Sequence, residues 1–383
     1  MKPIRTPIYL DNGATSWPKP EPVYAAADAA LRAAANPGRG AYRQAVEAQA
    51  HLERVRQEAC ALFNAPAPER VILTFNCTDA LSMALKGLID PDSRVVRGPW
   101  EHNSVTRPLD ALRKLGADVR IVDPTPDCGI DLDHLRELCR NGIDYVVMSH
   151  VSNVTGAVMP LAEIAAIAHE AGGLFIVDAA QSAGSHVIDM KAQGIDVLAT
   201  AGHKGLMGPM GTGLLILREP LPLRHWREGG TGFRAEMDGQ PEEYPWRLEA
   251  GTANVPGLAG LAAGMAWVRE RGVEAIGAHQ SALARQLAEG LQALPGVTYD
   301  GPAGGPDSGV VSFRLAAHSP AIAAGILDSG FGIALRSGLH CAPSAHRALG
   351  TLPEGTLRAS FGAFNAPEDV EALLAALQAI ATL

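Results

Sequence analysis

The sequence is poor in the features that mark disulfide-rich, zinc-binding and membrane proteins. It has five cysteines, an odd number, and no two of them form a CxxC pair, which argues against a disulfide framework and a zinc site. No apolar stretch approaches the length of a membrane span, because glycine, proline or a charged residue interrupts each one. The first twenty residues lack the apolar core of a signal peptide. We therefore expect a cytoplasmic protein with no membrane segment and no metal site.

The sequence also lacks an excess of positive charge. It contains 32 lysines and arginines against 41 acidic residues, a net charge of −9. Binding to nucleic acid through its phosphates requires a basic face, so we expect no nucleic-acid partner. The chain has 47% hydrophobic and 19% charged residues, which is typical of a globular protein, and its 383 residues suggest two domains.

Two buried-strand patterns lie close together in the middle of the chain. The apolar run 174–177 ends at Asp178, and the run 195–200 is followed by His203 and Lys204. In open parallel sheets, ligands bind at the edge where the strands end. Pyridoxal phosphate requires a lysine for a Schiff base and a carboxylate beside its pyridine nitrogen, so the pair is a candidate site for that cofactor. Each residue also has an ordinary interpretation, the acid as a helix cap and the lysine as a solvated side chain.

Strands and helices alternate along the first part of the chain. The predicted strands cover 71–75, 95–97, 118–122, 145–149, 174–177 and 195–200, and the predicted helices cover 22–35, 43–63, 106–115, 131–140 and 160–171, with a further helix ending at Leu88. This alternation predicts a doubly wound α/β domain with a mostly parallel sheet. Residues 218–256 are rich in Gly, Pro, Trp and Glu and lack a regular pattern. A segment of that kind typically covers a site or contacts a second subunit.

The last third of the chain predicts a smaller α+β domain. Two helices are expected within 256–294, further helices at 319–329 and 367–381, strands at 297–300, 309–315, 331–335 and 356–360, and a loop at 336–345. We therefore divide the chain into an N-terminal segment, 1–20, a large domain, 21–255, and a small domain, 256–383, which carries the loop with Cys341.

Polar loops follow several of the predicted strands. Asn76, Cys77 and Thr78 stand between a strand and a helix, where free backbone N–H groups and the helix dipole make an anion site. The alternative is that Thr78 or Asn76 only caps the helix. His102 follows the next strand in the same way, and a lone histidine in a loop is commonly a surface residue.

These pieces occur in one order that resembles a known family. The chain is similar to the class V aminotransferase superfamily of fold-type I pyridoxal-phosphate enzymes, and within it to the cysteine desulfurase and selenocysteine lyase branch with a short active-site loop. The resemblance spans the chain from Tyr9 to its end. The motifs that carry it are Glu101-His102, Ser152-Asn153-Val154-x-Gly156, Asp178-x-x-Gln181, Gly202-His203-Lys204 and Arg336-x-Gly338-x-His340-Cys341-Ala342.

The resemblance implies a role for each of these positions. Lys204 would bind pyridoxal 5′-phosphate covalently and move the Cα proton of the substrate. Asp178 would pair with the pyridine nitrogen, Gln181 with the phenolic oxygen, and His102 would stack on the ring. Cys77, Thr78 and His203 would hold the phosphate, which Thr252 of a partner subunit would also reach, so the active form would be a homodimer. Asn153 would contact both cofactor and substrate, and Arg358 and Arg336 would bind the substrate carboxylate, a group that suits the arginine fork.

Cys341 decides the subclass that the resemblance implies. A cysteine commonly behaves as a small hydrophobic residue, but Cys341 lies between Arg336, His340 and His346, a setting that favours a lowered thiol pKa. The implied reaction is desulfuration of L-cysteine to L-alanine, with a persulfide left on Cys341. L-Selenocysteine would be a second substrate whose selenium can leave without that attack. A sulfur-acceptor protein and a role in sulfur supply, such as iron–sulfur cluster assembly, follow from the same resemblance.

Three positions depart from the family pattern and leave alternatives open. Ala201 stands where a phosphate-binding Ser or Thr is usual, Cys77 where Thr is common, and Leu339 where His is frequent; backbone N–H groups or Thr200 are the expected compensation at the phosphate. One alternative is another class V lyase, epimerase or aminotransferase in which Cys341 is not catalytic. A second is a non-catalytic carrier on the same fold. A third, a nucleotide-binding protein, lacks support because the glycines of 205–213 follow Lys204, whereas those of a phosphate-binding P-loop precede its lysine.

Overall fold

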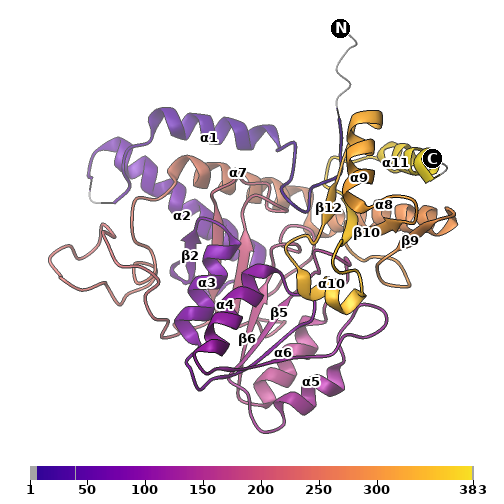
Figure 1. The fold of residues 1–383 in the computed structure, drawn as a ribbon. Helices are drawn as coiled ribbons and strands as arrows, with labels where there is room; N and C mark the ends of the chain where they lie inside the picture. The colour runs from indigo at the N-terminus through magenta and orange to yellow at the C-terminus, as the bar shows by residue number, and fades with distance from the viewer. Residues whose placement is uncertain (1–6, 39, 382–383) are drawn as a thin grey trace.

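The computed structural model describes residues 7–38 and 40–381 of the chain. The predicted N-terminal segment, 1–20, is therefore seen from residue 7 onward, and its first six residues lie outside the described part. Within the described residues the strands form one seven-stranded, one four-stranded and one two-stranded sheet. Figure 1 shows the large sheet in the body of the molecule, and the helices and strands that follow residue 272 gathered at one end of it.

The large sheet is mostly parallel, as the sequence predicts. In spatial order it contains β2 (Val71–Thr74), β8 (Gly213–Leu217), β7 (Val197–Ala201), β6 (Leu174–Asp178), β5 (Tyr145–Ser149), β3 (Arg94–Arg97) and β4 (Asp118–Ile121). The strands from β7 to β4 pair in parallel, whereas β8 runs antiparallel between β7 and β2. The strands that end at the same edge are therefore β2, β3, β4, β5, β6 and β7. Residues singled out in the sequence stand at the ends of five of them, namely β2, β3, β5, β6 and β7.

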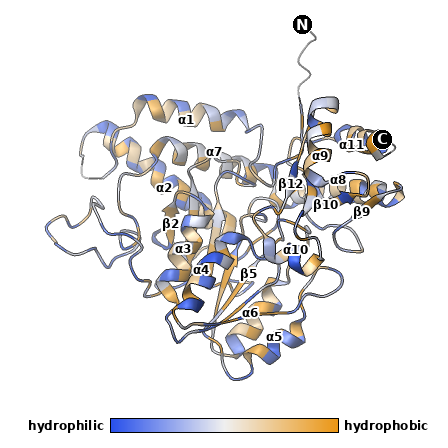
Figure 2. Ribbon diagram, viewed as in Figure 1, coloured by the Kyte–Doolittle hydropathy of each residue, from blue (hydrophilic) through white to orange (hydrophobic). Residues whose placement is uncertain are grey.

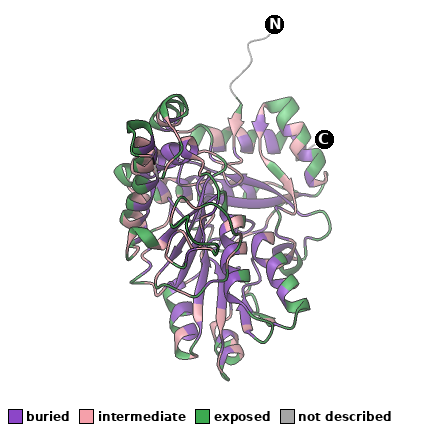
Figure 3. Cartoon of the chain, turned by 90° about the vertical axis from the view of Figure 1, so that its left-hand side faces the viewer, coloured by how far each residue is buried: buried purple, intermediate pink, exposed green. Residues whose placement is uncertain are grey.

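Helices cover both faces of this sheet. One face packs on α3 (Cys77–Leu88) and α4 (Asn103–Lys114), and the other on α2 (Arg43–Phe63), α5 (Leu132–Cys139), α6 (Leu161–Glu170) and α7 (Val255–Arg271). Successive side chains of a strand point to opposite faces. Phe175 and Val177 of β6 accordingly lie in one apolar core, and Ile176 between them lies in the other. Burial on both faces explains why these strands read as unbroken apolar runs, which are purple in Figure 3 and orange in Figure 2.

The smaller domain is built on an antiparallel sheet. Its strands are β12 (Arg336–Gly338), β13 (Thr356–Ser360), β10 (Val310–Leu315) and β9 (Val297–Tyr299), and its helices are α8 (Val273–Ala293), α9 (Pro320–Ile326), α10 (Pro343–Leu349) and α11 (Pro367–Ala381). A single π-helical turn, Leu327–Phe331, extends α9. The N-terminal segment joins this domain, because β1 (Ile8–Tyr9) pairs with β11 (Ile333–Ala334) and Leu10 lies in its core.

Two long helices meet where the two domains join. α7 packs on α1 (Glu21–Ala33) and α2, and its residues belong to the core of the large domain. α8 packs on α11 and the small sheet. The division at residues 255–256 stays a prediction, and this packing favours a division at Gly272, between α7 and α8.

The segment 336–345 differs from the loop that the sequence predicts. Residues Arg336–Gly338 form β12, and α10 begins at Pro343. Only the residues between them, which include Cys341, are irregular. Glycine at 338 and proline at 343 are typical of loops, yet Gly338 has a φ of +99° at the end of an edge strand and Pro343 occupies the first turn of a helix, where proline is well tolerated.

The long segment between β8 and α7 has no helix or strand in the described structure, in agreement with the prediction for 218–256. It is held by local contacts, including a parallel stack of Phe233 on Trp246 with ring centroids 3.9 Å apart. None of the helices in residues 7–38 and 40–381 combines the length and the apolar character that a bilayer crossing requires.

Candidate active site

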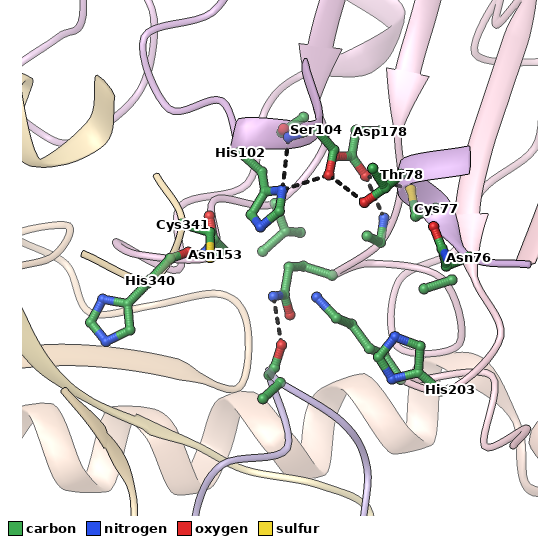
Figure 4. A pocket seen from close by; sticks show the side chains of 18 of the residues that line it. Asn76, Cys77, Thr78, His102, Ser104, Asn153, Asp178, His203, His340 and Cys341 are labelled. Carbon is green, nitrogen blue, oxygen red and sulfur yellow. Dashed lines mark hydrogen bonds between the residues drawn. The ribbon is translucent and has the colours of Figure 1, made fainter. Parts of the chain in front are cut away.

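One cavity lies at the edge where the parallel strands end. It has a volume of about 210 Å³ and is lined by both domains. Figure 4 shows side chains from the two domains pointing into it. The structure brings together almost all of the residues that the sequence singled out: Cys77, Thr78, His102, Asn153, Asp178, Gln181, His203, Lys204, Arg336, Cys341 and Arg358 line this cavity. Thr252 does not, and lies at two other hollows of the surface.

The N-terminus of α3 forms one wall. Asn76 caps the helix, because its side chain accepts a hydrogen bond from the backbone N–H of Asp79 at 2.9 Å, and Asp79 in return accepts one from the N–H of Phe75 at 3.0 Å. The N–H groups of Cys77 and Thr78 have no acceptor within the described residues. This arrangement presents free donors and the positive end of the helix dipole to the cavity. The structure shows that Asn76 is a cap, and the anion site beside it stays a prediction that the free donors support.

The side chains of Cys77 and Thr78 also line the cavity, and each has a partner within the chain. The thiol of Cys77 contacts Asp178 Oδ1 at 3.4 Å, and the hydroxyl of Thr78 bonds that of Ser104 at 2.7 Å. Burial, reinforced by the charge of Asp178, raises the pKa of the Cys77 thiol. Cys77 thus stays protonated and donates to the carboxylate. The backbone N–H groups of this helix remain available as phosphate donors.

Asp178 ends β6 with one carboxylate oxygen engaged and the other available. Oδ1 accepts the N–H of Ala180 at 2.9 Å and the thiol of Cys77, whereas Oδ2 has no hydrogen bond within the described chain. The side chain is buried. A buried carboxylate held through one oxygen can accept a proton-bearing ring nitrogen through the other.

Lys204 lines the same cavity as Asp178. Its position follows from the strand pairing: β7 ends at Ala201 beside β6, and the turn after it carries His203 and Lys204. Burial, helped by the charge of Arg358, lowers the pKa of Lys204 to about 8, although Asp178 opposes the shift. A substantial fraction of the amine is therefore neutral near neutral pH, which a lysine needs to attack an aldehyde.

His102 caps the start of α4. Its Nδ1 accepts the backbone N–H of Ser104 at 3.1 Å and lies 2.9 Å from the Ser104 hydroxyl. Burial lowers the pKa of His102 against the opposing charge of Asp178, so the ring is neutral with its hydrogen on Nε2. The imidazole reaches into the cavity (Figure 4) rather than into solvent, which removes the surface interpretation.

His203 and Gln181 complete the wall around Lys204. Burial lowers the pKa of His203 to about 4, and its Nδ1 is buried without a hydrogen-bond partner among the described residues. The backbone carbonyl of His203 accepts a hydrogen bond from the ammonium of Lys19 at 2.7 Å. Gln181 donates one of its amide hydrogens to the carbonyl of Gly13 at 3.0 Å, which leaves the second one for a ligand.

Asp11 joins the two arginines, although the sequence pattern did not lead us to predict it as a site residue. Its Oδ1 lies 3.0 Å from a terminal nitrogen of Arg358, and its Oδ2 lies 3.3 Å from Nε of Arg336. Arg358 also donates to the backbone carbonyl of Asn153 at 3.0 Å, and its buried Nε has no partner in the described part of the chain. The sequence does contain a signal for Asp11 as a site residue. Asp11 is an acid just after the first strand, much as Asp178 is an acid at the end of β6.

Cys341 lies exposed at the mouth of the cavity with a φ of +55°. The sequence analysis placed Cys341 between Arg336, His340 and His346. Burial lowers the pKa of His340 to about 2 and also lowers the pKa of His346, so neither histidine adds a positive charge there. The positive charges near the thiol are those of Arg336 and Arg358.

One of the two expected compensations at the phosphate differs in the structure. Thr200 does not line the cavity, because its hydroxyl points back to the carbonyl of Ala179 at 3.4 Å. Ala201 does line it and adds no donor. Ser104 was not predicted from the sequence; it links His102 to Thr78 through its hydroxyl.

Comparison with known proteins defines the class of this site. The family described as aminotransferase class-V matches residues 8–373. A protein of Methanothermobacter thermautotrophicus named probable cysteine desulfurase is 34% identical over 99% of this chain and 96% of its own length, and a cysteine desulfurase of Klebsiella pneumoniae is 32% identical over 98% and 94%. Among solved structures, the apo cysteine desulfurase of Thermococcus onnurineus NA1 superimposes with a TM-score of 0.91 at 34% identity, over 98% of this chain and 95% of that one. A cysteine desulfurase of Escherichia coli gives a TM-score of 0.88 at 30% identity over 98% and 95%.

The chain belongs to the aminotransferase class-V family, with the fold-type I architecture of pyridoxal-phosphate enzymes. Pyridoxal 5′-phosphate is accordingly its cofactor. The residues present fit that group. The free N–H groups of α3 and the unpartnered Nδ1 of His203 suit the phosphate, Lys204 suits the aldehyde, and the unengaged oxygen of Asp178 suits the pyridine nitrogen.

Proposed function

We propose that this protein is a cysteine desulfurase that converts L-cysteine to L-alanine and leaves the sulfur as a persulfide on Cys341. The observation that carries the proposal is the exposed thiol of Cys341, which lines the same cavity as Lys204 and Asp178. The relatives and solved structures similar to it over nearly the whole chain include several named cysteine desulfurase. The cofactor supplies an electron sink for the substrate carbon once its Cα proton has been lost.

The chain's own residues bind and orient the substrate. Arg358, fixed by Asp11 and Asn153, receives the substrate carboxylate, and Arg336 adds charge from the other side of Asp11. Asn153 also donates to the carbonyl of His340 at 2.7 Å. It therefore ties the carboxylate site to the segment that carries the nucleophile.

Lys204 and Cys341 perform the proton transfer and the attack. The amine of Lys204, with its lowered pKa, takes the Cα proton. The thiolate of Cys341 attacks the substrate sulfur, so an S–S bond forms as the Cβ–S bond breaks. The electron pair of the broken bond stays with the organic fragment, which takes up protons and leaves as alanine. His102, whose Nδ1 accepts the N–H of Ser104, would hold the cofactor ring in place.

The proposal extends to the partners, the location and a second substrate. The persulfide on an exposed residue suits transfer to a sulfur-acceptor protein, with iron–sulfur cluster assembly as one use of the sulfur. The thiols of the described chain are free, which suits the reducing cytoplasm. The active form is a homodimer in which Thr252 reaches the partner's phosphate site. L-Selenocysteine is a second substrate.

The experiment that tests the proposal measures sulfide and alanine from L-cysteine plus a thiol, with wild type and Cys341→Ala. We expect the variant to lose at least about a hundredfold in kcat, because the nucleophile is gone. Selenide release from L-selenocysteine serves as the control and should persist, since it shows that the cofactor site is intact. Equal turnover of L-cysteine by the two proteins would favour the alternative, a class V lyase, epimerase or aminotransferase in which Cys341 takes no part.

A further inference from the structure

The backbone at the nucleophile is held in an unfavourable conformation. His340 and Cys341 have φ values of +49° and +55°, in the left-handed region that residues with a Cβ rarely occupy. Two such residues in succession persist only where the surrounding structure imposes the conformation. The contacts that impose it here are therefore part of how Cys341 is presented to the cavity.

The main chain of this segment is held from the large domain. The carbonyl of His340 accepts the amide of Asn153 at 2.7 Å, and the carbonyl of Cys341 accepts the N–H of Asn103 at 2.7 Å. Ala342 closes the turn by donating its N–H to the carbonyl of Leu339 at 2.8 Å. These bonds fix the carbonyl groups, but they leave the side chain of His340 to be held from elsewhere.

That side chain is held by a second buried histidine. His340 Nδ1 lies 3.4 Å from His346 Nε2, and His346 Nδ1 lies 2.7 Å from the hydroxyl of Thr351. All three residues are buried, and His346 is completely so. Two facing ring nitrogens can bond only if one carries a hydrogen and the other does not, which neutral rings allow, and burial lowers the pKa of both. His346 lies on α10, which begins directly after the segment.

We propose that the chain of contacts His340–His346–Thr351 fixes the left-handed backbone that presents the Cys341 thiol to the cavity, so that His346 is a positioning residue for sulfur removal. The expected effect on sulfur removal rests on the proposed function. The expected effect on the backbone does not, because it concerns how firmly residues 339–342 are held in the enzyme with its cofactor bound. His346 lies five residues from Cys341 and acts through His340.

The test compares two substitutions of His346 in the holoenzyme. His346→Asn places an amide where Nδ1 lies and keeps a partner for Thr351, but it cannot reach His340. His346→Gln places its amide near the position of Nε2 and keeps that contact. We expect His346→Asn to speed hydrogen exchange of residues 339–342 at least about fivefold and to lower kcat on L-cysteine about tenfold, with KM within about twofold. His346→Gln should stay close to wild type in both measurements.

A threonine pair gives the matched control and a milder perturbation. Thr351→Val removes the hydroxyl that bonds His346, and Thr356→Val removes a buried hydroxyl that has no partner in the described structure. We expect faster exchange at 339–342 in the first variant and no change in the second. This pair decides the matter if the His346 variants fail to fold.

Three results would overturn the proposal. The first is wild-type hydrogen exchange and kcat in His346→Asn, and the second is an equal loss of kcat in the Asn and Gln variants. The third is equal hydrogen exchange at residues 339–342 in the two valine variants. Equal losses would mean that His346 only fills space. If wild type does not release sulfide from L-cysteine, the proposed function fails, yet the exchange data still decide whether His346 holds the segment.

Discussion

At the scale of single residues, Lys204 differs from an ordinary lysine in its protonation. Burial and Arg358 lower its pKa to about 8, so roughly a tenth of the amine is neutral at pH 7 and roughly nine tenths at pH 9. We expect the rate of pyridoxal-phosphate uptake by the apo protein to rise about tenfold between these values and then level off.

An amine at the ordinary lysine pKa of 10.5 would gain about a hundredfold over the same interval and would not level off. Uptake is followed by the absorbance of the lysine-bound cofactor, with Nα-acetyl-lysine as the control for the titration of the cofactor itself. A rise that parallels this control would show that the site does not lower the pKa of Lys204.

The sequence predicts individual site residues where a strand pattern fixes their place. Asp178 and Lys204 follow buried apolar runs, so their meeting at one edge of the sheet could be expected. The charge state of His340 and His346 could not, because it depends on burial by segments distant in the chain. The same holds for Asp11, whose two arginines lie more than 300 residues away in sequence.

At the scale of elements, the start of α3 links stability to anion binding. The cap by Asn76 orders the first turn, whose N–H groups at Cys77 and Thr78 remain free for a phosphate. Asn76→Ala removes the cap, and we expect it to cost the apo protein about 1 kcal/mol in the free energy of unfolding. It should also weaken cofactor binding, because the free donors become less ordered.

Asn76→Asp separates the two effects. An aspartate caps as well as asparagine, so the stability of the apo protein should stay at the wild-type value. Its negative charge beside the phosphate should nevertheless weaken cofactor affinity at least about tenfold. Denaturant unfolding and equilibrium titration with pyridoxal phosphate measure the two quantities. If the Asp variant bound as tightly as wild type, the phosphate would not lie at this helix.

Helices and strands are predictable from the sequence where a single hydrophobic pattern dominates a segment. The buried strands β5 to β7 are predicted to within two residues at either end, because short apolar runs between helices are typical of the central strands of a parallel sheet. The segment 336–345 is not predicted in this way, since glycine and proline indicate irregular structure locally, while β12 exists only through its pairing with β13. That pairing is a long-range contact with no local signal.

At the scale of the whole molecule, the cavity forms where the two domains meet. The residues proposed to hold the cofactor come from the edge of the large sheet, whereas Arg336, Cys341 and Arg358 come from the small domain. Asp11 and Asn153 couple the two, one from the N-terminal segment and one from the loop after β5. A substrate that bridges them contacts both domains at once.

The role of Thr252 depends on the assembly of two chains, because Thr252 lies outside the cavity of its own chain. If it serves the phosphate of a partner subunit, Lys204→Ala in one subunit and Thr252→Asp in the other damage the same site of a mixed dimer. One site then carries both changes and the other carries neither. Each variant alone should be inactive or nearly so, since aspartate repels the phosphate and alanine cannot bind the aldehyde.

Refolding the two variants together at equal amounts should therefore restore about a quarter of wild-type activity, because half of the dimers are mixed and each has one intact site of two. Light scattering gives the dimer mass in the same samples, and Lys204→Ala refolded with Asp178→Ala is the control, since two residues of one cavity cannot complement each other. No recovery of activity in the test mixture would mean that Thr252 contacts the phosphate site of its own chain or no phosphate site at all.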